Sequence, residues 1–271
     1  MSADISPLQT GARARRWGAW YVAEHKIRSM RGYIGTLVAT AIGTPFLYLF
    51  AFGVGLATLI TGNVGPVPGV TYLQFVAPAL LATAGLLVAM EEYTFGILLG
   101  FKWNAIFIGM NAAPISGRQI INGVVLFVGL RMLVTTSVYY LMMLLFGAVE
   151  PGWSALTIVA GLLCGFAFSP VAAYAATIQE DRGQFAILQR VIILPLTLFS
   201  GTLFPLTQLP IFLQWIGWLS PLWHASELGR QFVYGPTEPI WLTVTHVVYL
   251  IRLGVLGWQL CVRIATRRLD K

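Results

Sequence analysis

Residues 120–146 read IINGVVLFVGLRMLVTTSVYYLMMLLF, an apolar stretch interrupted by one charge, Arg131. A helix needs about 20 apolar residues to cross the roughly 30 Å hydrocarbon core of a bilayer. Apolar residues follow one another here instead of alternating with period two, the pattern of a membrane β-strand. The stretch therefore predicts a transmembrane helix.

Five more apolar stretches lie on either side of this one. The six predicted spans cover residues 34–60, 73–95, 120–146, 153–178, 191–204 and 240–262. The fifth is short and contains Pro195, so a bent or incomplete helix is expected there. The predicted fold is an all-α polytopic membrane protein in which residues 1–271 form a single domain, with the membrane part at 34–262.

The composition supports this class. Of 271 residues, 57% are hydrophobic and 10% are charged, whereas soluble domains carry about 25% charged residues. So little polar surface excludes a soluble globular domain, and so much apolar surface excludes disorder. The chain has 17 basic and 10 acidic residues but no compact basic domain, which argues against nucleic acid as a partner.

The basic residues indicate the topology. Six precede the first span and four follow the last, so both termini are expected in the cytoplasm. With residues 91–118 and 179–190 as inner connections, the inside holds 14 basic residues and the outside holds only Arg230. The uncharged, Gly- and Pro-rich segment 61–71 and the segments 147–152 and 205–239 are then outer connections. Residues 13–31 predict an interfacial helix with Trp17 and Trp20 on one side, although a plain positive anchor explains the segment as well.

Catalytic and metal-binding motifs are absent from the sequence. There is no G-x-x-x-x-G-K-[ST] loop for a nucleotide, no H-E-x-x-H and no G-x-S-x-G. Cys164 and Cys261 lie in apolar runs and offer no metal spacing, and the three histidines are scattered along the chain. The chain itself is therefore expected to be neither an enzyme nor a cofactor protein. A membrane scaffold or an intramembrane enzyme is the alternative to a transporter.

Two connecting segments resemble those of a known family. The first runs from Met90 to Gly123, with Glu92, Gly96, an apolar excursion and the Pro-Ile-Ser of 114–116. The second is FSGTLFPLTQLPIFLQWIGWLSPLWHASELGRQFVYG from Phe199, with Ser-Gly, Phe-Pro, Leu-Pro and Pro-Leu pairs and a later Arg230. Both are similar to the permease subunits of type-2 ATP-binding-cassette (ABC) transporters. The segment TPFLYLFAFGVGL from Thr44 resembles the nodulation-factor and drug-export branch of that family.

The resemblance implies a set of partners. Two separate ATPase subunits, which bind ATP and magnesium, would dock on the excursion between the second and third spans. Lys102, Asn104, Pro114 and Ser116 are the expected coupling residues. A second permease subunit, identical or paralogous, would complete a pathway for an amphipathic drug, lipid or lipid-linked glycan, surrounded by membrane lipid.

Two further groups of residues are expected at the pathway. Phe204, Pro205, Leu209 and Pro210 would form an outer gate on a re-entrant element, where the prolines end the fifth helix early. The aromatic residues expected to line the cargo cavity are Phe46, Tyr48, Tyr139, Tyr140 and Phe199.

A charged pair is expected between the second and third spans. Arg131 would lie about 12 Å below the inner surface at about 1.5 Å per residue, a depth at which an unpaired arginine costs about 2.5 kcal/mol or more. Glu92 near the inner end of the antiparallel second span is its expected partner, with Glu91 as the alternative acid. In the other interpretation Arg131 extends to the headgroups and Glu92 only caps its helix.

Overall fold

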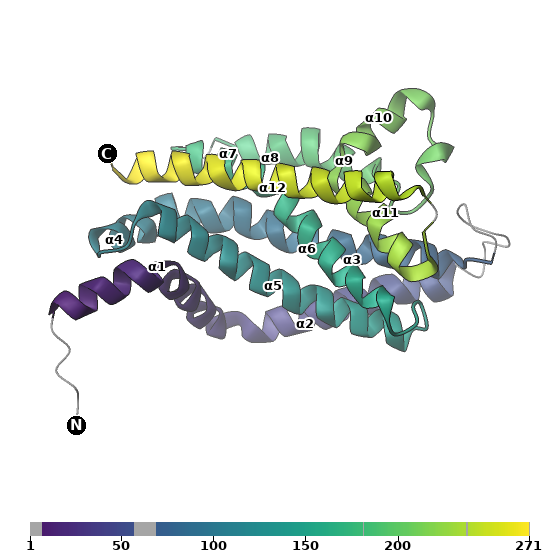
Figure 1. Ribbon diagram of the computed structural model, residues 1–271, viewed down its shortest axis with the longest axis horizontal. Helices are drawn as coiled ribbons and strands as arrows, with labels where there is room; N and C mark the ends of the chain where they lie inside the picture. The colour runs from purple at the N-terminus through teal and green to yellow at the C-terminus, as the bar shows by residue number, and fades with distance from the viewer. Residues whose placement is uncertain (1–6, 57–68, 181, 237, 271) are drawn as a thin grey trace.

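The computed structural model describes residues 7–56, 69–180, 182–236 and 238–270, and these residues form helices and no strand. The helices make an elongated bundle (Figure 1). The α-helices are α1 (Pro7–Ser29), α2 (Ile34–Phe50), α3 (Tyr72–Glu91), α4 (Ile106–Ala112), α5 (Gly117–Leu145), α6 (Thr157–Ala167), α7 (Ser169–Thr177), α8 (Gln184–Ile187), α9 (Leu194–Leu198), α10 (Ile211–Leu219), α11 (Pro221–Tyr234) and α12 (Ile240–Leu269). The 3₁₀- and π-helical segments are η1 (Met30–Tyr33), η2 (Ala51–Leu56), η3 (Glu92–Gly96), η4 (Leu99–Trp103), η5 (Trp153–Leu156), η6 (Leu188–Ile193) and η7 (Leu206–Gln208).

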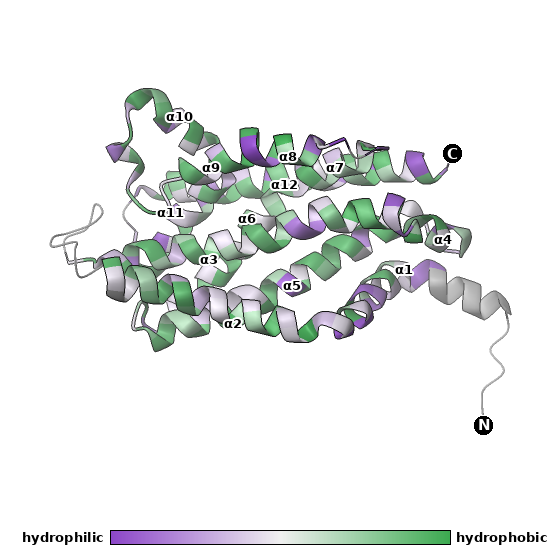
Figure 2. Ribbon diagram, turned by 180° about the vertical axis from the view of Figure 1, so that it is seen from behind, coloured by the Kyte–Doolittle hydropathy of each residue, from purple (hydrophilic) through white to green (hydrophobic). Residues whose placement is uncertain are grey.

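Within the described part of the chain, five continuous helical stretches are long and apolar enough to cross a membrane, which confirms the polytopic all-α class. They are Arg15–Gly53, Tyr72–Trp103, Gly117–Leu145, Trp153–Thr177 and Ile240–Leu269. The sixth, Gln184–Leu198, is apolar but shorter. At about 1.5 Å per residue it spans roughly 22 Å, less than the hydrocarbon core. Hydrophobic residues dominate the helices between the two ends of the bundle, whereas α1 carries several hydrophilic ones (Figure 2).

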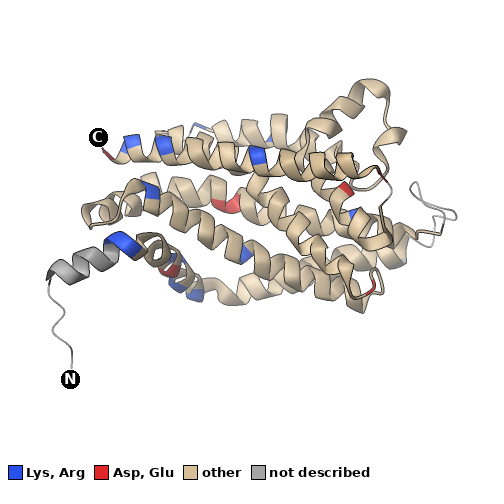
Figure 3. Ribbon diagram, viewed as in Figure 1, with Lys and Arg blue, Asp and Glu red and all other residues tan. Residues whose placement is uncertain are grey.

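The two ends of the bundle differ in what they carry. One end, called the α4 end below, holds α1, α4 and the C-terminal end of α12, and the opposite α10 end holds α10 and α11 (Figure 1). Lys and Arg gather toward the α4 end (Figure 3). Since α1 and the end of α12 lie together, the chain runs along the bundle an even number of times, with Gln184–Leu198 as one of the passes.

Several predicted boundaries are wrong. The second span does not stop at residue 95, because η3 and η4 continue the helix to Trp103. The fifth helix begins at Gln184 and not at 191, directly after Gly183, which has φ +82°. It ends at Leu198, well before Pro205. Between the end of the helix and Pro205 the chain turns at Gly201, which has φ +66°. Residues 57–68, which include the end of the first predicted span and most of the 61–71 connection, lie outside the described residues.

The last helix is also longer than predicted, reaching Leu269 instead of residue 262. Arg268 in its final turn donates to the carbonyls of Ala176 and Ile178 at 2.9 and 2.8 Å. These carbonyls belong to the end of α7, where the last C=O groups have no partner within the helix. The terminal arginine therefore joins α12 to α7 and extends the helix beyond its apolar part.

Helix α1 packs on α5 with one face and exposes the other. Val22 and Ala23 are buried, while Trp17 and Trp20 are exposed. A Cβ atom at Gly123 of α5 would lie 2.4 Å from the carbonyl oxygen of Ala19. The Gln119 side chain, part of a capping box with Ser116 at the start of α5, also donates to the carbonyl of Arg15 at 2.6 Å. The amphipathic character expected of residues 13–31 thus arises from packing on α5, and its place at a membrane surface stays a prediction.

Small residues let α3 and α6 approach closely. A Cβ atom at Gly85 of α3 would lie 2.5 Å from the carbonyl oxygen of Gly161 on α6, and one at Gly165 would lie 2.8 Å from the carbonyl oxygen of Gly85. Within a membrane, helices associate through such close backbone packing because lipid is as apolar as the side chains. The three glycines therefore hold the centre of the bundle together.

Replacing Gly85 with leucine is expected to destabilise the bundle by about 1–3 kcal/mol, because the side chain would have to push α6 away. Gly129→Leu on α5 is the matched control, since a Cβ atom there meets nothing within 4 Å. Thermal unfolding of the purified variants in detergent measures the difference. Equal melting temperatures for both variants would show that the α3–α6 contact does not hold the bundle together.

Candidate functional site

Four charged side chains meet between the helices at the side of the bundle nearer the α4 end. Arg131 of α5 donates from Nη1 to Glu92 Oε1 and from Nη2 to Glu91 Oε2, both at 2.7 Å. Lys26 of α1 donates from Nζ to Glu92 Oε2 at 3.0 Å. Two cations and two anions make this ion cluster (Lys26, Glu91, Glu92 and Arg131) neutral, and it connects α1, α3 and α5.

The ion cluster is mostly shielded. The exposed fractions of the side chains are 15% for Lys26, 9% for Glu92 and 11% for Arg131, against 56% for Glu91. A charge at this depth is costly unless a partner compensates it. The planar guanidinium of Arg131 reaches the two carboxylates from two separate nitrogens, whereas a lysine would have a single nitrogen for both. Lys26 also lies over the Phe127 ring at 5.0 Å.

Gly96 gives the ion cluster its room. A Cβ atom at this position would lie 2.6 Å from Glu92 Oε2 and 3.2 Å from Lys26 Nζ. The π-helical turn η3, which runs from Glu92 to Gly96, widens the helix at this point. The spacing of Glu92 and Gly96 in the sequence therefore has a physical reason, since the side chain of any other residue would displace Lys26.

The structure brings together the residues considered for the charged pair. Arg131 contacts Glu92, its expected partner, and Glu91, the alternative, at equal distances. Lys26 was not anticipated as a third partner of this pair. Its only signal in the sequence was a lysine on a helix expected near the inner membrane surface.

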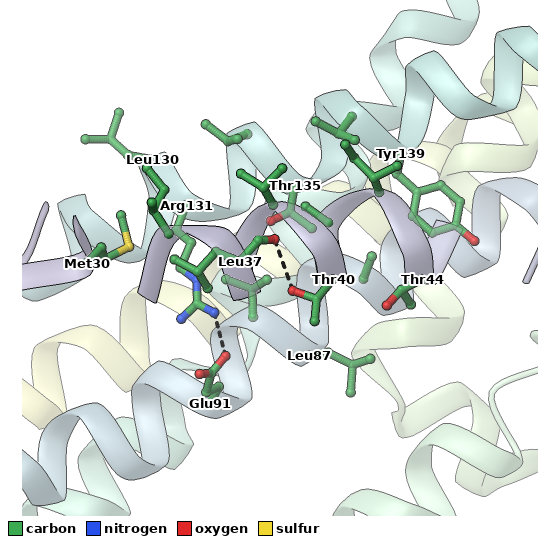
Figure 4. Close-up of a pocket in the computed structure, with 18 of the residues that line it drawn as sticks. Met30, Leu37, Thr40, Thr44, Leu87, Glu91, Leu130, Arg131, Thr135 and Tyr139 are labelled. Atoms are coloured by element: carbon green, nitrogen blue, oxygen red, sulfur yellow. Dashed lines mark hydrogen bonds and ion pairs between the residues drawn. The ribbon is translucent and has the colours of Figure 1, made fainter. Parts of the chain in front are cut away.

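A groove of about 610 Å³ leads from the ion cluster along α2, α3 and α5. Its wall is mostly aliphatic, and Glu91 and Arg131 supply the charged groups of its lining (Figure 4). Leu37 and Thr40 of α2, Leu87 of α3, and Leu130 and Thr135 of α5 are among the lining residues. One end is thus charged and the rest apolar, which suits an amphipathic molecule.

Of the five predicted cavity residues, Tyr139 lines this groove and the other four do not. Phe46 and Tyr48 are exposed on α2, where their rings stack on Phe50 and Phe52 with centroids 6.0 and 6.1 Å apart. Tyr140 is buried, and its hydroxyl lies 3.0 Å from the Ser154 hydroxyl. Phe199 is half-buried at the end of α9. The aliphatic residues of the groove carried no distinguishing signal in the sequence.

The predicted coupling residues lie at the α4 end. Lys102 is exposed on η4, and Asn104 and Pro114, also exposed, flank the short helix α4 on its two sides. Ser116 is the N-cap of α5, accepting from the Gln119 backbone N–H at 3.3 Å. Asn111 of α4 donates to the Leu269 carbonyl at 3.2 Å, which holds the helix against α12.

The predicted outer-gate residues lie at the α10 end. Phe204 and Pro205 are half-buried and precede η7, while Leu209 and Pro210 precede α10. The expected re-entrant element is built from two helices, α10 and α11, where the sequence suggested one. Ile211 and Phe212 of α10 are 85% and 68% exposed, as expected for a helix that meets lipid.

Arg230 of α11 fixes this end to the bundle. Its side chain is 1% exposed and lies over the Phe75 ring of α3 at 3.7 Å. It donates to the carbonyls of Phe75 at 3.1 Å and Gly201 at 2.7 Å, and to Glu227 Oε1 at 2.6 Å. One buried guanidinium thereby joins α3, α11 and the turn that follows α9.

The histidines are less scattered in space than in sequence. His224 Nδ1 of α11 lies 2.7 Å from His246 Nδ1 of α12, and His246 Nε2 lies 3.0 Å from Glu238 Oε2. The two histidines meet because α11 and α12 fold back on each other. Among the described residues, no group of three or more His, Cys, Asp or Glu is arranged to hold a metal ion.

Comparison with known proteins shows which family the chain belongs to. Residues 20–234 match the family model described as ABC-2 type transporter. Nodulation protein J of Rhizobium leguminosarum bv. viciae is 26% identical over 234 residues, which is 84% of this chain and 86% of the relative. The inner membrane transport permease YadH of Escherichia coli K12 is 26% identical over 246 residues, 87% of this chain and 91% of the relative. No solved structure matches the chain. With most of its length matched, the chain is a multi-pass membrane protein that belongs to the ABC-2 type transporter family.

Proposed function

We propose that this chain is the permease subunit of an ATP-driven exporter that moves an amphipathic drug, lipid or lipid-linked glycan out across the cytoplasmic membrane. The observation that carries the proposal is the groove between α2, α3 and α5, which is aliphatic along its length and charged at its end by Glu91 and Arg131. The apolar body of a cargo would lie along the wall and its polar group at Glu91, the most exposed member of the ion cluster.

The ion cluster would transmit movement from the ATPase to the groove. The helix Tyr72–Trp103 runs without a break from the groove, past Glu91 and Glu92, to the segment before α4. A displacement of α4 would therefore move Glu92 relative to Arg131 of α5 and Lys26 of α1. Rigid shifts of helices of this kind change the geometry of a cavity, and with it the affinity for cargo.

The ATP chemistry would come from other chains. Since the sequence has no phosphate-binding loop, two separate ATPase subunits would bind ATP and magnesium and dock at the α4 end. That end would face the cytoplasm with both termini, because the basic residues gather there. A second permease, identical or paralogous, would complete the pathway.

Cysteines introduced at Asn104 and Ile108 are expected to crosslink to the co-purified ATPase, because Asn104 is exposed and Ile108 on α4 is 58% exposed. Gln208→Cys at the opposite end is the matched control and is expected to give no crosslink. The native Cys164 and Cys261 are buried and do not compete for the reagent. An ATPase that crosslinks at Gln208 but not around α4, or no ATPase at all, would overturn the proposal.

A further inference from the structure

A chain of hydrogen bonds crosses the α10 end and connects three elements. It starts at the Trp218 carbonyl of α10, which lies 2.9 Å from His224 Nε2 of α11. It continues from His224 Nδ1 to His246 Nδ1 of α12 at 2.7 Å, and from His246 Nε2 to Glu238 Oε2 at 3.0 Å. His224 and His246 are 6% and 0% exposed, so no water replaces these partners.

The positions of the hydrogens follow from the partners. A carbonyl only accepts, so His224 Nε2 must carry the hydrogen that it donates to Trp218. In a neutral His224 the other nitrogen, Nδ1, is then an acceptor, and His246 Nδ1 must donate to it. In a neutral His246 the other nitrogen, Nε2, then carries no hydrogen, and its lone pair faces the carboxylate of Glu238.

Two acceptors cannot form a hydrogen bond, so the contact between His246 and Glu238 requires one additional proton. It resides either on His246, as an imidazolium beside a carboxylate, or on Glu238, as a neutral acid that donates to His246. Gln231 does not remove this requirement, because its amide already donates to Glu238 Oε2 at 3.2 Å while its carbonyl accepts from Thr243 at 2.6 Å.

Few other titratable groups face these residues. Tyr249 of α12 stacks on His224 at 4.1 Å and donates to the Leu219 carbonyl at 2.7 Å. Tyr234 of α11 lies within the electrostatic influence of Glu238 and of the Arg230–Glu227 pair. Trp223 packs its edge against both imidazoles and carries no charge. The required proton is therefore shared between His246 and Glu238.

We propose that His224, His246 and Glu238 form a proton-binding site, in which one bound proton joins Glu238 to His246 of α12. Because Glu238 also accepts from Gln231 of α11, this proton helps to fasten α11 to α12. Loss of this proton sets the lone pair of His246 Nε2 against the carboxylate of Glu238. Because these two groups repel each other, Glu238 is released. A second proton, on His224, sets two N–H donors against each other at the His224–His246 contact. The site is thus closed only in its singly protonated form, and its position on the outer side rests on the orientation given under the proposed function.

The burial of His224 determines how far the pH can fall before the closed state becomes unstable. His224 lies on α11, outside the five long spans. Burial and then the neighbouring His246 lower the pKa of His224 from 6.5 to about 4. An exposed His224 binds a proton more readily than the buried one. The closed site therefore loses stability relative to an opened one as the pH falls from about 6.5 toward about 4.

Nitrogen-15 NMR of the full chain in lipid nanodiscs reads the hydrogen positions directly, since the chain has only three histidines. Near neutral pH we expect a scalar coupling between His224 Nδ1 and His246 Nδ1, with hydrogen on His224 Nε2. His25, exposed on α1, is the internal reference and should show no coupling to another histidine. Absence of the coupling between His224 and His246 would overturn the proposal.

Glu238→Gln tests the required proton itself, because the amide of glutamine can donate a hydrogen bond to His246 Nε2 without binding an additional proton. Spin labels at Pro236→Cys, two residues before Glu238, and Thr245→Cys, both exposed positions, would report one distance while the proton is bound and a second population once raised pH has removed it. Glu238→Gln should keep the single distance to higher pH, and Glu238→Ala should show two at every pH. Glu150→Gln, an exposed acid outside the cluster, is the matched control.

If Glu238→Gln and Glu150→Gln respond to pH alike, the site does not hold the proton. Neither measurement needs ATP, cargo or an ATPase subunit. The proton-binding site can therefore fail while the proposed export function stands, or hold while that function fails.

Discussion

Replacing Arg230 with leucine is expected to lower the free energy of unfolding by about 3–5 kcal/mol, the usual cost of removing one member of a buried ion pair. The guanidinium is 1% exposed, and its loss leaves Glu227, 18% exposed, without its cation. It also leaves the Phe75 and Gly201 carbonyls without their donor. Because these carbonyls belong to α3 and to the turn after α9, the α10 end should loosen first. Unfolding of the purified variant in detergent, followed by heat or denaturant, measures the loss.

Arg182→Leu is the control for this change, because the Arg182–Glu180 pair is exposed, at 77% and 64%, and such pairs contribute about 0–1 kcal/mol. Arg230→Leu combined with Glu227→Leu should recover part of the stability, since no uncompensated charge remains. If Arg230→Leu proves as stable as Arg182→Leu, the buried arginine does not hold the α10 end.

Arg131→Leu is expected to reduce cargo-stimulated ATP hydrolysis by about tenfold or more, while the variant still reaches the membrane. The change breaks the contacts from α5 to both carboxylates but leaves Glu92 paired with Lys26. Movements of α3 would therefore no longer be passed on to α5 through the ion cluster. A tenfold loss corresponds to about 1.4 kcal/mol. Arg131→Lys should recover only part of the activity, because an ammonium group offers one nitrogen where the guanidinium offers two in a fixed fork.

Glu92→Gln should impair hydrolysis more than Glu91→Gln, since Glu92 binds two cations and is 9% exposed, against 56% for Glu91. The exchange of Glu92→Arg with Arg131→Glu is not a clean test, because an arginine at 92 would face Lys26. Arg118→Leu, an exposed position on the same helix, is the matched control. Equal activity of Arg131→Leu and Arg118→Leu would show that the ion cluster plays no part in coupling.

The helices and the ion pair could be predicted from the sequence because the alternative to each would have a high free energy. Apolar runs need a bilayer, and an arginine about 12 Å deep needs a carboxylate at the same depth on the neighbouring helix. These inferences required only the chain itself and the thickness of a membrane.

Other features depend on how helices far apart in the chain pack. Lys26 reaches Glu92 because α1 packs on α5, and His224 meets His246 because α11 folds back against α12. No spacing along the sequence encodes either contact. The end of the fifth helix was misplaced for a related reason, since Pro205 is a stronger signal than the Gly201 turn that ends the helix. The groove was missed because aliphatic residues that face a cavity look like those that face lipid.

The most direct test of the exporter account uses inside-out membrane vesicles that contain this chain and the ATPase that co-purifies with it. Fluorescent amphipathic dyes, a fluorescent phospholipid and a lipid-linked glycan are supplied outside the vesicles with ATP and magnesium. The account predicts ATP-dependent accumulation of at least one of these probes inside the vesicles, lost with Arg131→Leu and kept with Arg118→Leu. Vesicles in which the chain is folded but no ATPase associates and no probe moves with ATP would contradict it.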